Sequence, residues 1–272
     1  MTRSASRNPM ILAIAQVRYQ LRLLTRSPLS TFTVIVIPLL LLVTLKAVMP
    51  ADALAALRGG RYVDFLTPAM ATFAVLNAAY INVITGVVLA RDTGVLKRLR
   101  GTPLPTWSHL AGRLVAAVIT GTLAAAVVVA VGVVLLDADF APRRLGWGLL
   151  LVTLACCCLS VLALAVSVVV PKPDSALPIA YGTVLPLGFI SDVFFPATTA
   201  PGWLRHLAAF FPVAPLAHAA EALFGAKSTG WPMTGTGLAA VLAWTAVAAV
   251  IAATTFRSEP GPLLHPRRWS RS

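Results

Sequence analysis

Long apolar runs without charge, repeated along the chain, most constrain what this sequence can fold into. Residues 65–90 and 145–170 contain no charged side chain, and a helix needs roughly 20 apolar residues to cross a bilayer core. Only 11% of all residues are charged, against about 25% in soluble domains. A water-soluble fold would have too little charge to cover its surface, so we expect a membrane protein.

Charged residues delimit six such segments, which predicts an all-α polytopic membrane protein with six transmembrane helices in one domain over residues 1–272. The predicted spans are residues 29–49, 64–90, 110–136, 145–170, 175–195 and 233–256. Pro38 and Pro186 lie inside two of them and should kink those helices locally. The first apolar stretch, "MILAIAQV", is short and is followed at once by arginines, so we expect no cleavable signal peptide.

The distribution of Lys and Arg predicts the orientation. With the N-terminus in the cytoplasm, the inner loops and termini hold most of the basic residues, whereas basic and acidic residues balance on the outer side. Basic inner loops orient multi-pass proteins in this way. We therefore expect a protein of the cytoplasmic (plasma) membrane with both termini in the cytoplasm. The formal net charge of +13 then reflects topology and not nucleic-acid binding.

Two cytoplasmic elements are expected. Residues 8–27 predict an amphipathic helix, with Arg18, Arg22 and Arg26 stepping by four along one side. It is either a simple membrane-surface anchor or a helix that also shapes a docking surface. The second element is the basic stretch "RDTGVLKRLRGTP" at residues 91–103.

The basic stretch has the pattern of a short helix. Gly94 permits a tight turn before it, Val95 and Leu99 share one side, and Gly101 followed by Pro103 stops it. A solvated loop between spans explains the charge, whereas a docking element for a soluble partner also explains the apolar side. Both readings stay open on these residues alone.

Little in the sequence suggests catalysis. Cys156, Cys157 and Cys158 are consecutive and cannot converge on one metal. His218 and Glu221 share a helix face but make an incomplete metal site. A phosphate-binding loop needs G-x-x-x-x-G-K-[ST], and the nearest stretch, "GAKS" at residues 225–228, has the wrong spacing. We therefore predict no enzyme and no metal or cofactor bound by this chain.

The spans also lack the ionisable groups that ion-coupled carriers use, apart from Lys46 near a span end. Asn77 and Asn82 are five residues apart, about 140° around a regular α-helix, so they should form no single polar stripe. We expect them to hydrogen-bond to neighbouring helices. Residues 196–225 are too interrupted to span and too apolar for an ordinary loop, which predicts two short helices re-entering from the outer side, with Pro215 in a first turn.

Two stretches carry a family resemblance. They are "ARDTGVLKRLRGTPLPTWSHLAGRL" (residues 90–114) and "FFPATTAPGWLRHLAAFFPVAPLAHAAEAL" (residues 194–223). With the six spans, they resemble the type-2 ATP-binding-cassette (ABC) exporter permeases, especially those like the daunorubicin-resistance membrane subunit. The resemblance implies a separate ABC ATPase subunit that binds ATP and Mg²⁺, and two permease chains in one exporter. It also implies that spans two and five line the dimer interface and the transport path.

The resemblance assigns residues to three elements. The cytoplasmic coupling loop at residues 91–101, with Asp92 where the family more often has Glu, would contact the ATPase through Arg91, Asp92, Gly94, Val95, Lys97, Arg98, Leu99 and Arg100. The helix at residues 8–27 would be the interface helix, through Arg18, Arg22 and Arg26. The outer re-entrant segment would cap the path, with Trp203, His218 and Glu221 as its candidate residues.

The function expected from this resemblance is the permease of an ATP-driven exporter, of the kind that confers antibiotic resistance by multidrug efflux. It would move a hydrophobic or amphipathic, drug-like or lipid-like molecule outward, with the ATPase, a second copy of the chain and membrane lipid as partners. A permease for a lipid-linked glycan is the alternative within transport. A non-transporting assembly factor or membrane-embedded enzyme is the alternative from another class.

Overall fold

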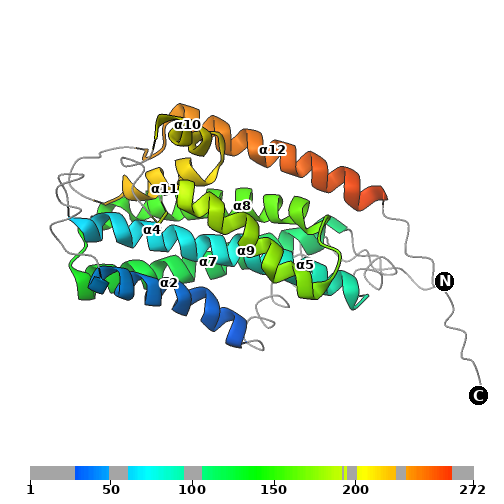
Figure 1. Ribbon diagram of the computed structural model, residues 1–272, viewed down its shortest axis with the longest axis horizontal. Coiled ribbons are helices and arrows are strands. Elements are labelled where there is room, and N and C mark those ends of the chain that lie inside the picture. Colours follow the sequence, from blue (N-terminus) through cyan, green and yellow to red (C-terminus); the bar gives the residue numbers. More distant parts are fainter. Residues whose placement is uncertain are drawn as a thin grey trace, which may run out of the picture.

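The computed structural model describes residues 28–48, 61–94, 106–191, 193–194, 201–224 and 231–258, and all its regular elements are helices. The helices are α2 (Pro28–Val48), α4 (Tyr62–Leu76), η1 (Asn77–Ile81), α5 (Asn82–Asp92), α7 (Thr106–Leu136), η2 (Pro142–Arg144), α8 (Leu145–Ser167), α9 (Pro173–Ile190), α10 (Gly202–Phe210), α11 (Val213–Glu221) and α12 (Gly235–Ser258). The longer helices run roughly along the long axis of the molecule (Figure 1). The all-α prediction is confirmed for the described part of the chain.

Four helical segments are long and apolar enough to cross a membrane: Tyr62–Asp92, Gly112–Leu136, Pro142–Ser167 and Gly235–Thr254. They correspond to four of the six predicted spans. The other two predicted spans coincide with α2, which contains Pro38, and with α9, which contains Pro178 and Pro186. That α2 and α9 also cross, for a total of six spans, stays a prediction.

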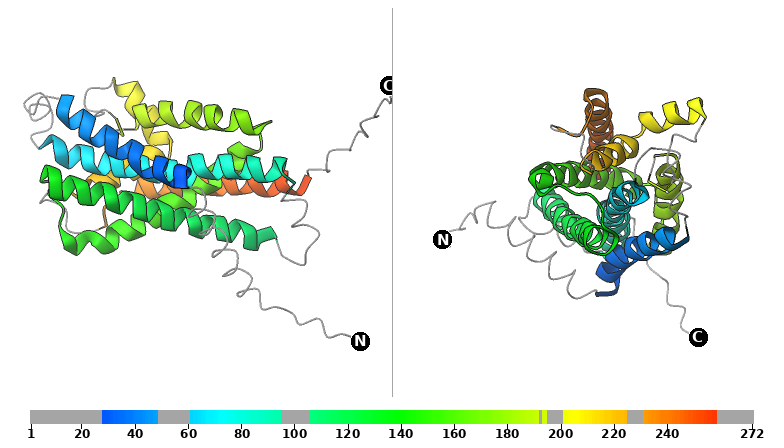
Figure 2. Two further views of the ribbon diagram at one scale, coloured as in Figure 1. Left: turned by 90° about the horizontal axis from the view of Figure 1, so that it is seen from below. Right: turned by 90° about the vertical axis from the view of Figure 1, so that its left-hand side faces the viewer.

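The segment formed by α4, η1 and α5 is the central helix of the bundle. Of the residues in the most apolar stretch of this segment, 78% are buried inside the molecule, against 22% to 39% for the other three candidate spans. Seen end-on, it lies between α2, α7, α8 and α9 (Figure 2). In the single chain this span is therefore enclosed by protein on most of its surface.

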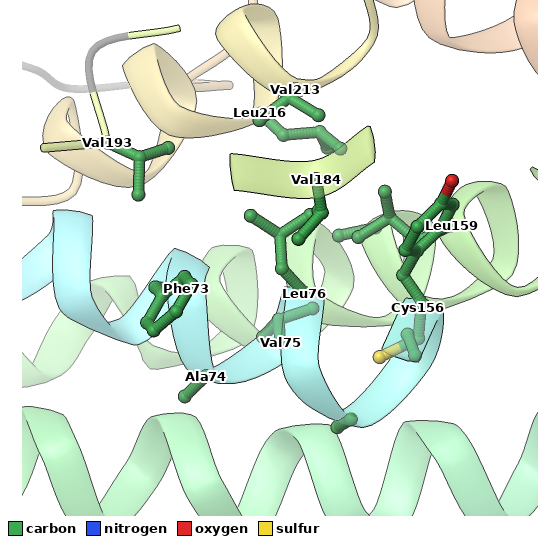
Figure 3. Packing of buried hydrophobic residues seen from close by; sticks show 14 of the residues in the cluster. Phe73, Ala74, Val75, Leu76, Cys156, Leu159, Val184, Val193, Val213 and Leu216 are labelled. Carbon is green, nitrogen blue, oxygen red and sulfur yellow. The ribbon is translucent and has the colours of Figure 1, made fainter. Parts of the chain in front are cut away.

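Small residues allow the helices to pack closely around this centre. A Cβ atom on Gly132 of α7 would lie 2.3 Å from Cγ2 of Thr67 in α4, and one on Gly121 would lie 2.8 Å from Sγ of Cys156 in α8. Close backbone approach of this kind is typical of helix packing in membranes. Figure 3 shows the side chains of α4 meeting those of α8, α9 and α11, with Leu76 and Val184 among them.

The central helix departs from regular α geometry at η1, a five-residue π-helix. The backbone N–H of Asn82 donates to the carbonyl oxygen of Asn77, five residues earlier. The expected separation of Asn77 and Asn82 by about 140° assumes 3.6 residues per turn, and this assumption is wrong here. Because a π turn is wider, the two residues lie closer to one face than the sequence predicts.

The remaining predicted elements are partly described. Residues 201–224 contain two short helices, α10 and α11, with Pro215 in the first turn of α11. Their insertion from the outer face stays a prediction. The predicted interface helix at residues 8–27, with Arg18, Arg22 and Arg26, lies outside the described residues.

Candidate functional site

The coupling stretch begins where the central helix ends. Gly94 has a positive φ of 70°, a conformation that glycine adopts without steric cost. Its N–H donates to the carbonyl oxygen of Arg91 at 3.2 Å, and the N–H of Thr93 donates to that of Leu89 at 3.0 Å. A left-handed glycine just beyond the last helical turn is a common helix stop. The tight turn predicted at Gly94 is confirmed.

Arg91 turns back onto its own chain. Its Nη1 donates to the carbonyl oxygen of Ser167 at 3.3 Å, and its Nη2 donates to that of Val170. Ser167 is the last residue of α8, where carbonyl groups have no helical partner and the helix dipole favours a cation. Val170 lies three residues further on, in the connection to α9. Arg91 therefore ties the end of the central helix to the connection between α8 and α9. Asp92 beside it is exposed.

A second arginine braces the same end of the bundle. Nη2 of Arg113 in α7 donates to the carbonyl oxygen of Gly86 in α5 at 2.7 Å. A Cβ atom on Gly86 would lie 2.6 Å from Nη1 of Arg113, so a larger residue there would displace the guanidinium. This contact could not be predicted from the sequence, because nothing in the spacing of Arg113 points to Gly86.

The remaining predicted coupling residues lie outside the described part of the chain. They are Val95, Lys97, Arg98, Leu99 and Arg100. The described part of the stretch therefore brings Arg91, Asp92 and Gly94 to one end of the central helix, next to the α8–α9 connection. Contact of this stretch with an ATPase stays a prediction.

Polar side chains join α9 to the central helix. The hydroxyl of Tyr181 donates to Oδ1 of Asn77 at 3.2 Å, and the hydroxyls of Tyr80 and Thr183 are 3.0 Å apart. Asn77 also donates from Nδ2 to the carbonyl oxygen of Phe73 at 2.9 Å. The expected hydrogen bond from Asn77 to a neighbouring helix is confirmed. The roles of Tyr181 and Thr183 were missed, because one Tyr and one Thr in an apolar run do not reveal their partners.

The three cysteines serve different packing contacts. Sγ of Cys156 lies 3.5 Å from the carbonyl oxygen of Ala117 in α7, and Sγ of Cys158 lies 3.7 Å from that of Val241 in α12. All three thiols are free, and they do not converge, as expected. Across the described ranges, no group of three or more His, Cys, Asp or Glu residues is placed to hold a metal ion.

The residues assigned to the outer segment lie on two short helices. Trp203 of α10 is 68% exposed, His218 of α11 is exposed, and Glu221 at the end of α11 is half-buried. A hydrogen bond holds α10 against α12: Nε1 of Trp244 in α12 donates to the carbonyl oxygen of Phe210 at 2.7 Å. A transport role for Trp203, His218 and Glu221 stays a prediction.

A helical bundle with four segments long and apolar enough to cross a membrane indicates a multi-pass membrane protein. The family model described as ABC-2 type transporter matches residues 12–226, well over half of the sequence, and the chain belongs to this family. It is thus the membrane permease component of an ABC transporter, a transport component that is not itself catalytic, and the family implies association with an ABC ATPase. No curated protein matches the sequence.

Proposed function

We propose that this chain is the permease of an ATP-driven exporter that moves a hydrophobic or amphipathic, drug-like or lipid-like molecule out of the cytoplasm or inner leaflet. Two copies would act with two ATPase subunits, and residues 94–100 would dock on the ATPase. The proposal rests on the family and on the apolar character of the candidate spans.

The observation that carries the docking proposal is the junction at Arg91 and Gly94. The stretch leaves the enclosed central helix through a shaped turn at Gly94, and Arg91 links this turn to the end of α8 through Ser167 and Val170. A displacement of residues 94–100 would therefore reach two spans at once, the central helix and α8. Motion carried by rigid elements with two arrangements is how such coupling works.

The test uses the chain co-purified with its cellular ABC ATPase and reconstituted in lipid vesicles. Leu99→Glu places a charge on the apolar side of the predicted coupling helix, and we expect it to abolish substrate-stimulated ATP hydrolysis while membrane insertion is retained. Thr236→Glu is the matched control, because Thr236 is exposed in the first turn of α12 at the opposite end of the bundle and an acidic residue is tolerated there. Stimulated hydrolysis unchanged by Leu99→Glu would contradict the docking proposal.

Substrate class and direction need a second measurement. Inside-out vesicles holding the complex should accumulate a fluorescent amphipathic dye when ATP is added. Stimulation of hydrolysis only by a lipid-linked glycan, without dye accumulation, would favour the glycan permease instead. The molar mass of the purified complex measures whether two permease chains are present.

A further inference from the structure

A cavity of about 360 Å³ lies between α4, α7, α8 and α11, within the range of about 300–1,000 Å³ that is usual for ligand sites. Its lining is almost wholly apolar. Leu76 of α4, Leu159 of α8 and Leu216 of α11 contribute to it and are labelled in Figure 3. The cavity lies within one chain, so it does not depend on a dimer.

Helix packing explains why space remains here. α7 is held against α4 at Gly132 and meets α8 at Gly121, where a Cβ would lie 2.8 Å from Sγ of Cys156. Between these contacts, α7 and α8 line the cavity with small residues, among them Ala125 and Ala155. Small side chains on facing helices leave a void that larger ones would fill.

The loop between α7 and α8 contributes Phe140 to the lining and is held in place from several sides. The N–H of Asp139 donates to Oδ1 of Asp64 at 2.8 Å, and Nη1 of Arg144 donates to the carbonyl oxygen of Leu223 at 3.0 Å. The rings of Phe140 and Phe224, both in the cavity lining, have centroids 5.3 Å apart. These hydrogen bonds and the ring contact hold the loop in place, so this side of the cavity is a fixed part of the fold.

The cavity runs from the surface to the interior. Val134 of α7 and Leu145 of α8, both in the lining, are 74% and 57% exposed. Leu76 and Leu216, at the other side of the cavity, are buried. In a membrane permease, apolar residues on membrane-crossing helices that no protein covers face the hydrocarbon of the bilayer.

We propose that this cavity binds the hydrocarbon chain of a bilayer lipid, which enters between α7 and α8. Among the described residues that line it, only Thr72 and Thr122 have polar side chains, and the hydroxyl of Thr72 already donates to the carbonyl oxygen of Pro68 at 2.9 Å. A polar solute would lose its hydrogen bonds to water without replacement, which costs several kcal/mol. A hydrocarbon chain loses none and is the molecule present at the mouth.

The headgroup is not selected by this site. The adjoining loop presents exposed groups of both signs, Asp137, Asp139 and Arg143, outside the apolar lining. The inference therefore concerns the lipid tail, and it does not depend on the exported substrate of the proposed function.

The experiment uses the full chain in nanodiscs of phosphatidylethanolamine and phosphatidylglycerol containing a lipid with a diazirine in the acyl chain. After illumination, labelled peptides are mapped by mass spectrometry. Lipid around the protein reaches only exposed residues, whereas a chain in the cavity also reaches the buried lining of α4, between Pro68 and Leu76. We expect label on these α4 residues, and label confined to exposed residues would overturn the proposal.

Cavity-filling variants sharpen the result. The double variant Ala125→Leu, Ala155→Leu enlarges two buried lining residues, and we expect about a tenfold loss of α4 labelling, equivalent to about 1.4 kcal/mol. Ala246→Leu, the same change at an exposed site on α12, should leave α4 labelling unchanged. Undiminished labelling in a folded double variant, or cross-linked chain dimers in place of lipid label on α4, would contradict the assignment. Should the double variant not fold, the wild-type labelling pattern alone decides.

Discussion

At the scale of a residue, Gly94 and Arg91 differ in how far their structure could be predicted from the sequence. Gly94 could be predicted as a turn, because helix-stop signals are local in the chain and glycine is the residue that adopts positive φ freely. The contacts of Arg91 could not, because Ser167 is 76 positions away and a surplus of basic residues looks the same whether each cation faces solvent or a carbonyl group. The resemblance assigned Arg91 to the ATPase, whereas its guanidinium contacts its own chain.

The first prediction concerns this contact. Replacing Arg91 with alanine removes the cationic donor from the carbonyl oxygens of Ser167 and Val170, so Arg91→Ala should lower the free energy of unfolding by about 1.5–3 kcal/mol, the usual range for a hydrogen bond to a charged group. Arg91→Lys should recover part of this loss, because an ammonium cannot match the guanidinium fork. Chemical unfolding in detergent micelles measures both. Lys172→Ala, at an exposed lysine on the same side, is the control and should have little effect.

A second residue-scale prediction concerns Gly132. A methyl group there would overlap Thr67, which is fully buried and has no room to move. Gly132→Ala should therefore destabilise the protein by about 1–3 kcal/mol through overpacking. Gly146→Ala should cause no loss, since nothing lies within 4 Å of a Cβ at that position. Equal melting temperatures for the two variants would show that α7 does not pack on α4 in this way.

At the scale of elements, apolar run length predicted the four strong spans well, because crossing a bilayer needs a fixed helical length. It could not predict η1 (Asn77–Ile81). A π-helix is a local change of backbone hydrogen bonding, and the residue types in this stretch carry no signal for it. Nor could it predict that the second span is enclosed. Burial by other helices and burial by lipid select the same apolar residues.

The bond between α9 and the central helix can be measured by a double-mutant cycle. Asn77→Ala and Tyr181→Phe each remove one side of the 3.2 Å hydrogen bond. We expect a coupling free energy of about 0.6 kcal/mol, the average for such bonds in membranes. The pair Asn77→Ala and Tyr62→Phe is the control, since Tyr62 lies a full helix length from Asn77 at the start of α4, and should show no coupling.

At the scale of the whole molecule, the orientation and the number of spans are decided by accessibility. In a background where Cys156, Cys157 and Cys158 are alanine, we expect Arg143→Cys and Pro201→Cys to react with a membrane-impermeant thiol reagent on intact cells. Asp92→Cys and Lys172→Cys should react only after permeabilisation. All four positions are exposed.

The pair Lys172 and Pro201 brackets α9, so labelling of both from one side would show that α9 does not cross. Labelling of Asp92→Cys but not Arg143→Cys from outside would reverse the predicted topology. Val48→Cys, at the exposed end of α2, applies the same test to the first predicted span and should be labelled from outside.

The enclosed position of the central helix has a consequence for biogenesis. α4 is synthesised early, yet one of the helices that covers it, α11, begins only at Val213. Until that late segment emerges, the part of α4 that packs against α11 faces lipid or earlier helices in place of its final neighbour. The segment from Val213 onward therefore completes the cover of α4, and a product truncated before Val213 would expose this helix to the cell's membrane quality control.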